Sequence, residues 1–133
     1  MARTDERENL MKMIYQMSIQ DDFSAAEYEK FTELQADSDI TEYFINGYQA
    51  VSKYLDEIDE RINTYSVKWK TSRLPKVDLA ILRLSMAELY YLDDIPVSVS
   101  INEAVELAKK YSTEKSSGFI NGVLGSAARE LSK

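Results

Sequence analysis

The chain contains no cysteine and no histidine. Without cysteine it cannot form disulfide bonds, thiolate metal sites or a thiol nucleophile. Without histidine it also lacks the means for a Ser-His-Asp triad or an ordinary zinc site. Carboxylate, lysine or tyrosine chemistry stays open, but the composition weakens the case for an enzyme, and we expect neither a metal nor a cofactor.

Proline, glycine and long apolar runs are also scarce. Two prolines and four glycines leave little material for the turns of an all-β fold. No window approaches the roughly 18 continuous apolar residues of a membrane span. The polar start MARTDERENL, with charges of alternating sign, is unlike a secretory signal. We therefore expect a cytoplasmic protein without a membrane segment.

The length of 133 residues and the hydrophobic content of 44% predict one domain, residues 1–133, with one core. The net charge of −7 is unevenly distributed, because residues 1–66 hold 6 basic and 15 acidic side chains, whereas residues 67–133 hold 10 and 8. Overall acidity disfavours strong nonspecific nucleic-acid binding, which depends on neutralising phosphates. A local basic face on the C-terminal half is still compatible with this distribution.

Apolar residues recur every three or four positions along most of the chain, which predicts an all-α fold of six or seven helices. The stretch 76–92, KVDLAILRLSMAELYYL, is apolar on nearly every side, so it predicts a central helix surrounded by the others. The other helices are expected over residues 4–20, 24–34, 39–65, 97–111 and about 118–131, with a short helical turn within 67–74.

Two features of these helices require close neighbours. Arg83 lies in the apolar arc of the central helix and needs a counter-ion, for which Glu103 or Glu106 is expected. Glycines inside a helix cost about 1 kcal/mol each relative to alanine. A neighbouring helix or a ligand is therefore expected to approach the stripe formed by Gly118, Gly122 and Gly125.

A basic run lies just before the central helix and contains the one tryptophan of the chain. It consists of Lys68, Lys70, Arg73 and Lys76 around Trp69. Basic side chains interleaved with an aromatic ring can hold single-stranded nucleic acid. A solvated connector between two helices explains the same residues, and the sequence alone leaves both interpretations open.

Three segments of the C-terminal half resemble the NusB family of bacterial transcription antitermination factors. They are LRLSMAELYYLDDIP at 82–96, INEAVELAKKY at 101–111 and FINGVL at 119–124, in the order and at the spacing of that family. The resemblance implies an all-α fold of two helical subbundles and a role without catalysis. It also implies pairing with the small-subunit ribosomal protein NusE, binding of boxA RNA, and assembly with NusA, NusG and RNA polymerase. The free protein would be a monomer or a homodimer.

The resemblance also implies site residues. On the NusE-binding surface it places Tyr15 and Asp78, the latter expected to be exposed on a polar strip of the central helix. Phe119 is expected either to face the RNA or to lie in the core. The full set implied for RNA binding is Arg3, Arg7, Lys109, Lys110, Lys115, Phe119 and Asn121.

Two other functions fit the sequence. The same helical fold occurs as the N-terminal domain of RsmB-type rRNA cytosine methyltransferases, although this chain has no glycine-rich cofactor loop and no catalytic cysteine. A helical adaptor that binds no RNA is the third interpretation.

Overall fold

The computed structural model describes residues 3–131, which form seven α-helices, two short 3-10 helices and no strand. The predicted all-α fold is confirmed. None of these helices is both long and apolar enough to cross a bilayer. In chain order the elements are α1 Arg3–Gln20, α2 Ala25–Glu33, η1 Asp37–Asp39, α3 Glu42–Lys53, α4 Leu55–Tyr65, η2 Thr71–Arg73, α5 Lys76–Tyr91, α6 Val97–Tyr111 and α7 Glu114–Arg129.

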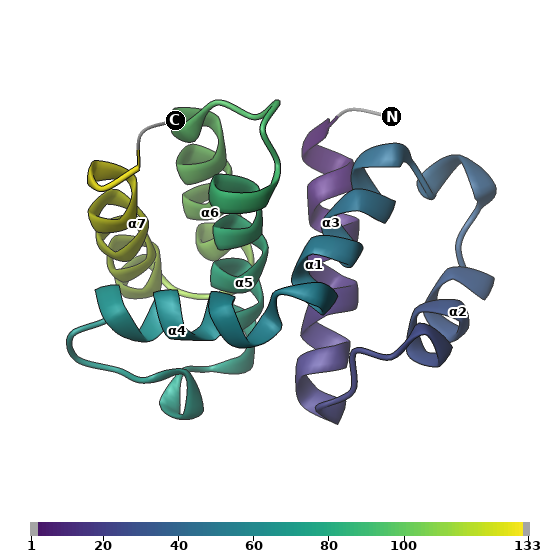
Figure 1. Ribbon diagram of the computed structural model, residues 1–133, viewed down its shortest axis with the longest axis horizontal. Helices are drawn as coiled ribbons and strands as arrows, with labels where there is room; N and C mark the ends of the chain where they lie inside the picture. Colours follow the sequence, from purple (N-terminus) through teal and green to yellow (C-terminus); the bar gives the residue numbers. More distant parts are fainter. Residues whose placement is uncertain (1–2, 132–133) are drawn as a thin grey trace.

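Helix α5 is the centre of the molecule, as its sequence predicts. Every residue from Asp78 to Leu89 is buried, and α5 contacts α1, α3, α4, α6 and α7. Helices α1, α2 and α3 form one subbundle, and α4, α6 and α7 pack around α5 in the other (Figure 1). Helix α5 therefore packs against both subbundles, and its buried residues belong to one hydrophobic cluster with those of α1 and α3.

Short polar side chains cap the N-termini of three of the helices. Ser24, Thr41 and Thr113 each accept a hydrogen bond from the backbone N–H three residues later, which satisfies a donor that the helix itself leaves free. The start of α2 after Ser24 agrees with the helix predicted from residue 24. Helix α3 begins after Thr41 rather than at residue 39, because Asp39 belongs to the preceding 3-10 helix.

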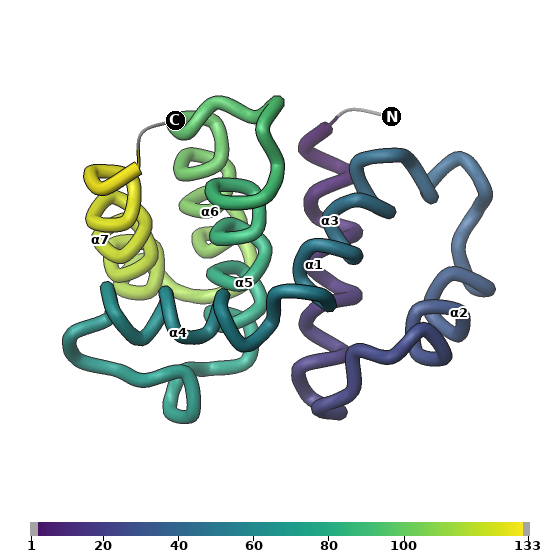
Figure 2. Tube along the Cα trace, viewed as in Figure 1, coloured from purple at the N-terminus to yellow at the C-terminus, as the bar shows by residue number. Residues whose placement is uncertain are grey.

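One long helix was predicted over residues 39–65, and this prediction is wrong. At Tyr54 the backbone leaves helical geometry, with φ −110° and ψ 24°, and the chain turns between α3 and α4 (Figure 2). The Tyr54 ring stacks on Tyr91 of α5, with centroids 4.0 Å apart and planes 3° from parallel. The turn lets α3 pack on α1 while α4 packs on α5 and α7.

A buried ion pair joins the subbundles. Arg7 of α1 donates to both carboxylate oxygens of Glu88 on α5, over 2.7 and 3.1 Å, and these two residues are 2% and 1% exposed. Arg7 also donates to Glu103 of α6 at 3.1 Å. Glu88 accepts further bonds from Tyr43 of α3 and Ser100 of α6. Burial and the adjacent Glu88 charge raise the pKa of Tyr43, so its phenol stays protonated and donates.

The counter-ion of Arg83 differs from the one predicted. Arg83 is buried and donates to both oxygens of Asp59 on α4, over 2.9 and 2.8 Å, and to the Ser18 hydroxyl at 2.8 Å. The expected partners Glu103 and Glu106 are engaged elsewhere, Glu103 with Arg7 and Glu106 with Lys109. The need for a carboxylate was correct, but α4 rather than α6 supplies it.

Among residues 3–131 no neighbouring helix approaches the glycine stripe of α7, so the helix alternative of that prediction is wrong, and the ligand alternative stays a prediction. Among residues 3–131, nothing beyond the backbone of α7 itself lies within 4 Å of a Cβ built on Gly118 or Gly122, and on Gly125 only Arg129 does, at 3.9 Å. The close contact occurs at Gly47 of α3, where a Cβ would lie 2.3 Å from Cδ2 of the fully buried Leu10. Glycine at this position lets α3 approach α1.

Replacing Arg7 by alanine is expected to lower the free energy of unfolding by about 3–5 kcal/mol, because Glu88 would remain buried without its counter-ion. Denaturant melts of Arg7→Ala and of Lys30→Ala test this. Lys30 is a matched control, since its side chain is 72% exposed and pairs with Glu27 at 3.2 Å, so its loss should cost less than about 1 kcal/mol. Equally small effects for both variants would contradict the role of Arg7.

Gly47→Ala and Gly122→Ala are expected to change stability in opposite directions. The first forces a methyl group against Leu10, and overpacking of this kind costs about 1–3 kcal/mol. The second adds a better helix former where space is open, and should stabilise by up to about 1 kcal/mol. Thermal melts of both variants measure the difference, and a stabilising Gly47→Ala would refute the close packing of α1 on α3.

Candidate nucleic-acid interface

A groove of about 430 Å³ lies between the segment that links α4 to α5 and the first turns of α7. We call it the connector groove. Trp69 and Phe119 line it with aromatic rings, and Lys68, Arg73 and Lys115 bring positive charge. The structure thus joins the basic run before the central helix to the FINGVL segment, two features that lie about fifty residues apart in the chain. Its remaining lining residues are Leu74, Pro75, Asp78, Thr113 and Ser116.

Hydrogen bonds to the end of α4 fix the connecting segment. The buried Ser66 hydroxyl donates to the carbonyl of Trp69. The Asn63 side chain accepts from the backbone N–H of Thr71 at 2.9 Å, and Leu74 anchors the far end in the core. These bonds fix the backbone of Trp69, while 43% of the residue stays exposed. Such a ring is available for stacking against a ligand.

Asp78 fixes the opposite wall. It was expected to be exposed, and that expectation is wrong, because Asp78 is 3% exposed. Its carboxylate accepts from the hydroxyls of Ser112 and Ser116, at 2.7 and 2.8 Å. These bonds tie the turn between α6 and α7 to the first turn of α5, which sets the position of Lys115 and Phe119. Asp78 therefore shapes the groove rather than presenting a charge at the surface.

The charges of the connector groove favour an anion. Lys68, Arg73 and Lys115 are exposed, and no hydrogen bond or ion pair within residues 3–131 is seen for their charged groups. The one carboxylate in the lining, Asp78, is buried and satisfied by two hydroxyls. Phe119 is half-buried, so part of its ring contributes to the core and part lines the groove. Within residues 3–131 no cluster of carboxylates is placed to hold a metal ion.

The two N-terminal arginines lie far from this groove. Arg7 is buried against Glu88, so its guanidinium cannot reach an external phosphate, which corrects the expectation that it faces RNA. Glu88 follows Asp78 by ten residues on α5, a rise of about 15 Å at 1.5 Å per residue. Arg3 is exposed, but its guanidinium lies 4.5 Å from the Tyr43 ring centroid and 3.2 Å from Glu6. The start of α1 is at the opposite end of the molecule from η2 (Figure 1).

The remaining predicted RNA contacts are exposed but dispersed. Lys110 donates to both oxygens of Glu8, over 3.1 and 2.9 Å, and this bond raises the pKa of Lys110. The pKa of Glu8 is lowered most by a hydrogen bond from the Tyr111 hydroxyl, and further by the hydrogen bonds from Lys110. Lys109 pairs loosely with Glu106 of its own helix. Asn121 is exposed on α7, and it is absent from the lining because residues two apart on a helix point in different directions.

Tyr15, the remaining predicted partner contact, lies at a second and smaller groove of about 300 Å³. We call it the tyrosine groove. It lies between α1, α5 and α6, and its lining is Met11, Lys12, Tyr15, Val77 and Tyr111. Asp78 follows Val77 directly, so the tyrosine groove and the connector groove flank the first turn of α5.

Relatives of known family match this chain along almost its whole length. The family model described as NusB family matches residues 4–129. The transcription antitermination protein NusB of Natranaerobius thermophilus is 44% identical over 140 residues, a match covering 100% of this chain and 99% of the relative. That of Acetivibrio thermocellus is 46% identical over 130 residues, covering 97% and 90%.

Solved structures share the fold. T. maritima NusB superposes with a TM-score of 0.87 and 32% identity, covering 100% of this chain and 94% of that one. A chain in the crystal structure of antitermination factors NusB and NusE in complex with dsRNA gives a TM-score of 0.82 at 24% identity, covering 98% and 100%. Given the family match over residues 4–129 and relatives of this identity and coverage, the chain belongs to the NusB family.

Proposed function

We propose that this protein is a cytoplasmic transcription antitermination factor that pairs with the ribosomal protein NusE and binds boxA RNA of nascent rRNA transcripts. It would act with NusA, NusG and RNA polymerase and would catalyse no reaction. Membership of the NusB family and relatives named as transcription antitermination proteins support this. The observation that carries the RNA-binding part is the connector groove, in which two aromatic rings and three exposed cations converge.

The chemistry of the connector groove suits a single strand. Unpaired bases can stack on Trp69 and on the accessible part of Phe119, while Lys68, Arg73 and Lys115 neutralise neighbouring phosphates. Lys109, Lys110 and Asn121 are exposed on the adjoining helices and would extend the RNA path. Arg3 is exposed at the far end of α1 and would contact only a longer RNA. Arg7 is assigned to the core instead.

The partner would bind at the tyrosine groove. Tyr15 is half-buried there beside Val77 and Tyr111, an amphipathic surface of the kind that protein interfaces favour. Asp78 would act indirectly, by holding the turn between α6 and α7. Because the tyrosine and connector grooves flank the same turn of α5, a bound partner would lie next to the RNA and could extend its contact surface.

The two other functions make different predictions. The relatives at 44% and 46% identity are antitermination proteins that match over 99% and 90% of their own lengths, which favours the antitermination factor over a methyltransferase domain. An adaptor without RNA binding would bind NusE but leave boxA RNA unbound. A pull-down with purified NusE, followed by RNA titration of the complex, separates the adaptor from the antitermination factor.

Trp69→Ala is expected to weaken binding of a boxA oligonucleotide about fivefold to a hundredfold, since one stacked base contributes about 1–3 kcal/mol. Trp69→Phe keeps an aromatic face and should retain most of the affinity. Lys30→Ala, an exposed lysine on α2, is the control and should change nothing. Fluorescence titration over a salt series measures both affinity and its salt slope. A Trp69→Ala protein that binds RNA as tightly as the wild type would remove the connector groove from the RNA site.

Glu8→Gln is expected to strengthen RNA binding modestly. The substitution frees Lys110 and removes the carboxylate 3.7 Å from Lys12, which raises the local positive charge. Each added phosphate contact steepens the salt slope by roughly 0.7 for a single strand. Glu27→Gln, which frees Lys30 on the distant helix α2, is the matched control. Unchanged affinity and slope for Glu8→Gln would exclude Lys110 from the RNA path.

A further inference from the structure

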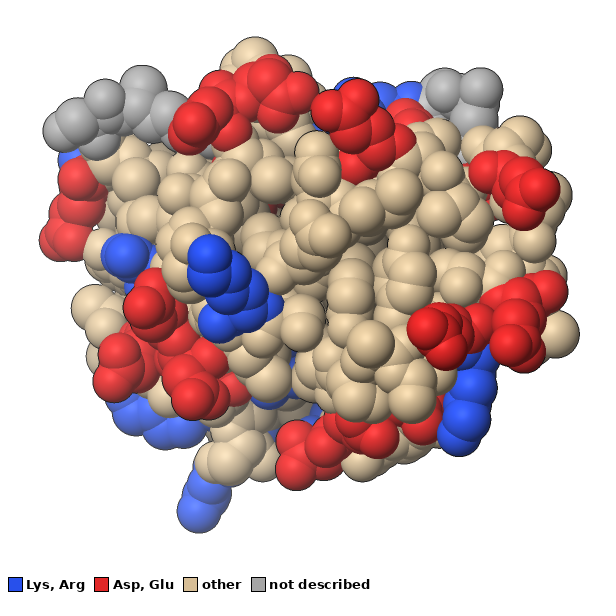
Figure 3. All heavy atoms as spheres, turned by 45° about the vertical axis from the view of Figure 1, so that its right-hand side comes forward, with Lys and Arg blue, Asp and Glu red and all other residues tan. Residues whose placement is uncertain are grey.

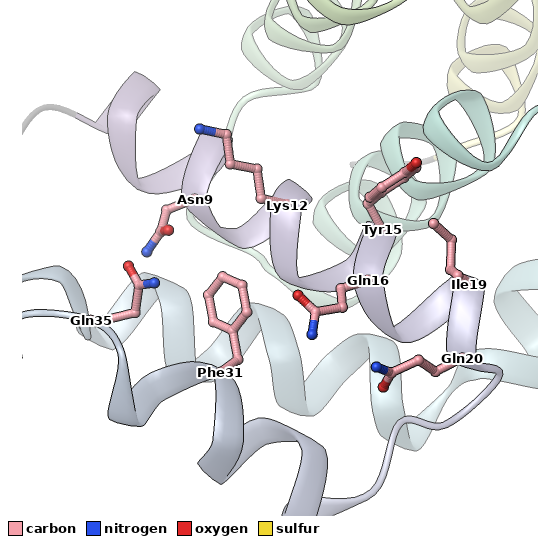
Figure 4. A pocket seen from close by; sticks show the side chains of 8 residues that line it. All are labelled: Asn9, Lys12, Tyr15, Gln16, Ile19, Gln20, Phe31 and Gln35. Carbon is pink, nitrogen blue, oxygen red and sulfur yellow. The ribbon is translucent and has the colours of Figure 1, made fainter.

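A third groove lies between α1 and α2, and carboxamides make up half of its lining residues. It measures about 620 Å³, and its lining includes Asn9, Gln16 and Gln20 of α1, Gln35 just after α2, and the ring of Phe31. The side chains of Asn9 and Gln16 point toward Phe31 across the space between the two helices (Figure 4). We call it the amide groove.

One donor in the amide groove lacks an acceptor. Nδ2 of Asn9 is shielded from solvent, yet no hydrogen-bond partner for it exists among residues 3–131. A shielded polar group without a partner destabilises the folded chain, so such groups are rare in native proteins. Because Nδ2 is shielded in the free chain, a ligand carbonyl can accept from it only when the Asn9 amide turns toward the groove.

The α2 wall of the amide groove is open to a partner. None of the nine residues of α2 is buried, and the helix is held chiefly through its rings. Phe31 stacks on Phe44 with centroids 6.4 Å apart, and Tyr28 lies against Tyr48 at 4.4 Å. At the edges of this region Ile19 is 54% exposed and Leu34 is 86% exposed. A bound chain would therefore cover apolar surface as well as satisfy the amides.

The charge of this region favours a polypeptide over RNA. Lys12 is the one charged residue in the lining, and its ammonium lies 3.7 Å from Glu8. Residues 1–66 hold 15 acidic and 6 basic side chains, and Asp and Glu are spread over the face that Figure 3 shows. RNA binding requires neutralised phosphates, which this groove does not provide. Each carboxamide offers both donors and an acceptor, which matches the alternating N–H and C=O groups of an extended peptide.

We propose that the amide groove binds an extended polypeptide segment of the same partner that sits at the tyrosine groove. Tyr15 and Lys12 line both grooves, so a chain bound at one can continue over α1 into the other. In the bound state a backbone carbonyl accepts from Asn9 Nδ2, Gln16 and Gln35 pair with neighbouring peptide groups, and an apolar side chain packs on Phe31. This inference rests on the proposed pairing with a ribosomal protein.

Two substitutions test the groove by calorimetric titration with purified NusE. Asn9→Asp keeps the shape but replaces the free donor with a carboxylate, and Gln16→Leu removes one exposed amide. Each should raise Kd about tenfold, since an interface hydrogen bond lost to an unpaired group weakens binding on this scale. Affinity for a boxA oligonucleotide should stay unchanged. Gln49→Leu, an exposed glutamine on α3 outside the groove, is the matched control.

Hydrogen exchange provides the second readout. Addition of NusE should protect the amides of α2 in the wild type, and this protection should fall in both groove variants. Protection of α2 by RNA alone, or by raised concentration of the free chain, would overturn the proposal in favour of RNA or a second copy. Wild-type affinity in both variants would also overturn it while the proposed function stands. If the wild type fails to bind NusE at all, the proposed function and this inference both fall. Should Asn9→Asp lower the melting temperature, Gln16→Leu decides the outcome.

Discussion

The fold depends on a charge pair that is buried between the two subbundles. Arg7 and Glu88 are almost completely buried, and hydrogen bonds from Tyr43 and Ser100 complete the shell around the carboxylate. The pair spans α1, α3, α5 and α6, so it fixes both subbundles on the central helix. Removing one partner of such a pair destabilises the fold strongly, although the intact pair stabilises it little more than well-packed apolar side chains would. The pair is therefore a strong constraint on how the helices meet.

Burial of charged side chains also decides which charges remain at the surface. An arginine near the N-terminus looks available for RNA, but Glu88 binds it inside the core. Asp78 at the other end of α5 is likewise buried, and through Ser112 and Ser116 it positions the start of α7. The polar strip of the central helix thus organises the molecule from within. Free positive charge and aromatic surface are left together at the connector groove, where α4, α5 and α7 meet.

Much of the fold could be predicted, because helical periodicity and caps are local. The all-round apolar stretch 76–92 indicated a central helix, and the apolar spacing indicated the helices around it. The break at Tyr54 could not be found in this way, because the apolar spacing runs through it and the turn is stabilised by stacking on Tyr91. The acid that pairs with Arg83 and the close contact at Gly47 likewise depend on helices that are distant in sequence.

For the candidate site too, some features follow from the local sequence and others only from packing. The sequence by itself determined the helical class, the composition without cysteine or histidine, the basic run around Trp69 and the segments typical of the NusB family. Only the tertiary structure decided which charges are free, since burial and pairing arise when distant segments pack. It placed Arg7 and Asp78 inside, left Lys68, Arg73 and Lys115 outside, and brought Trp69 to the same groove as Phe119.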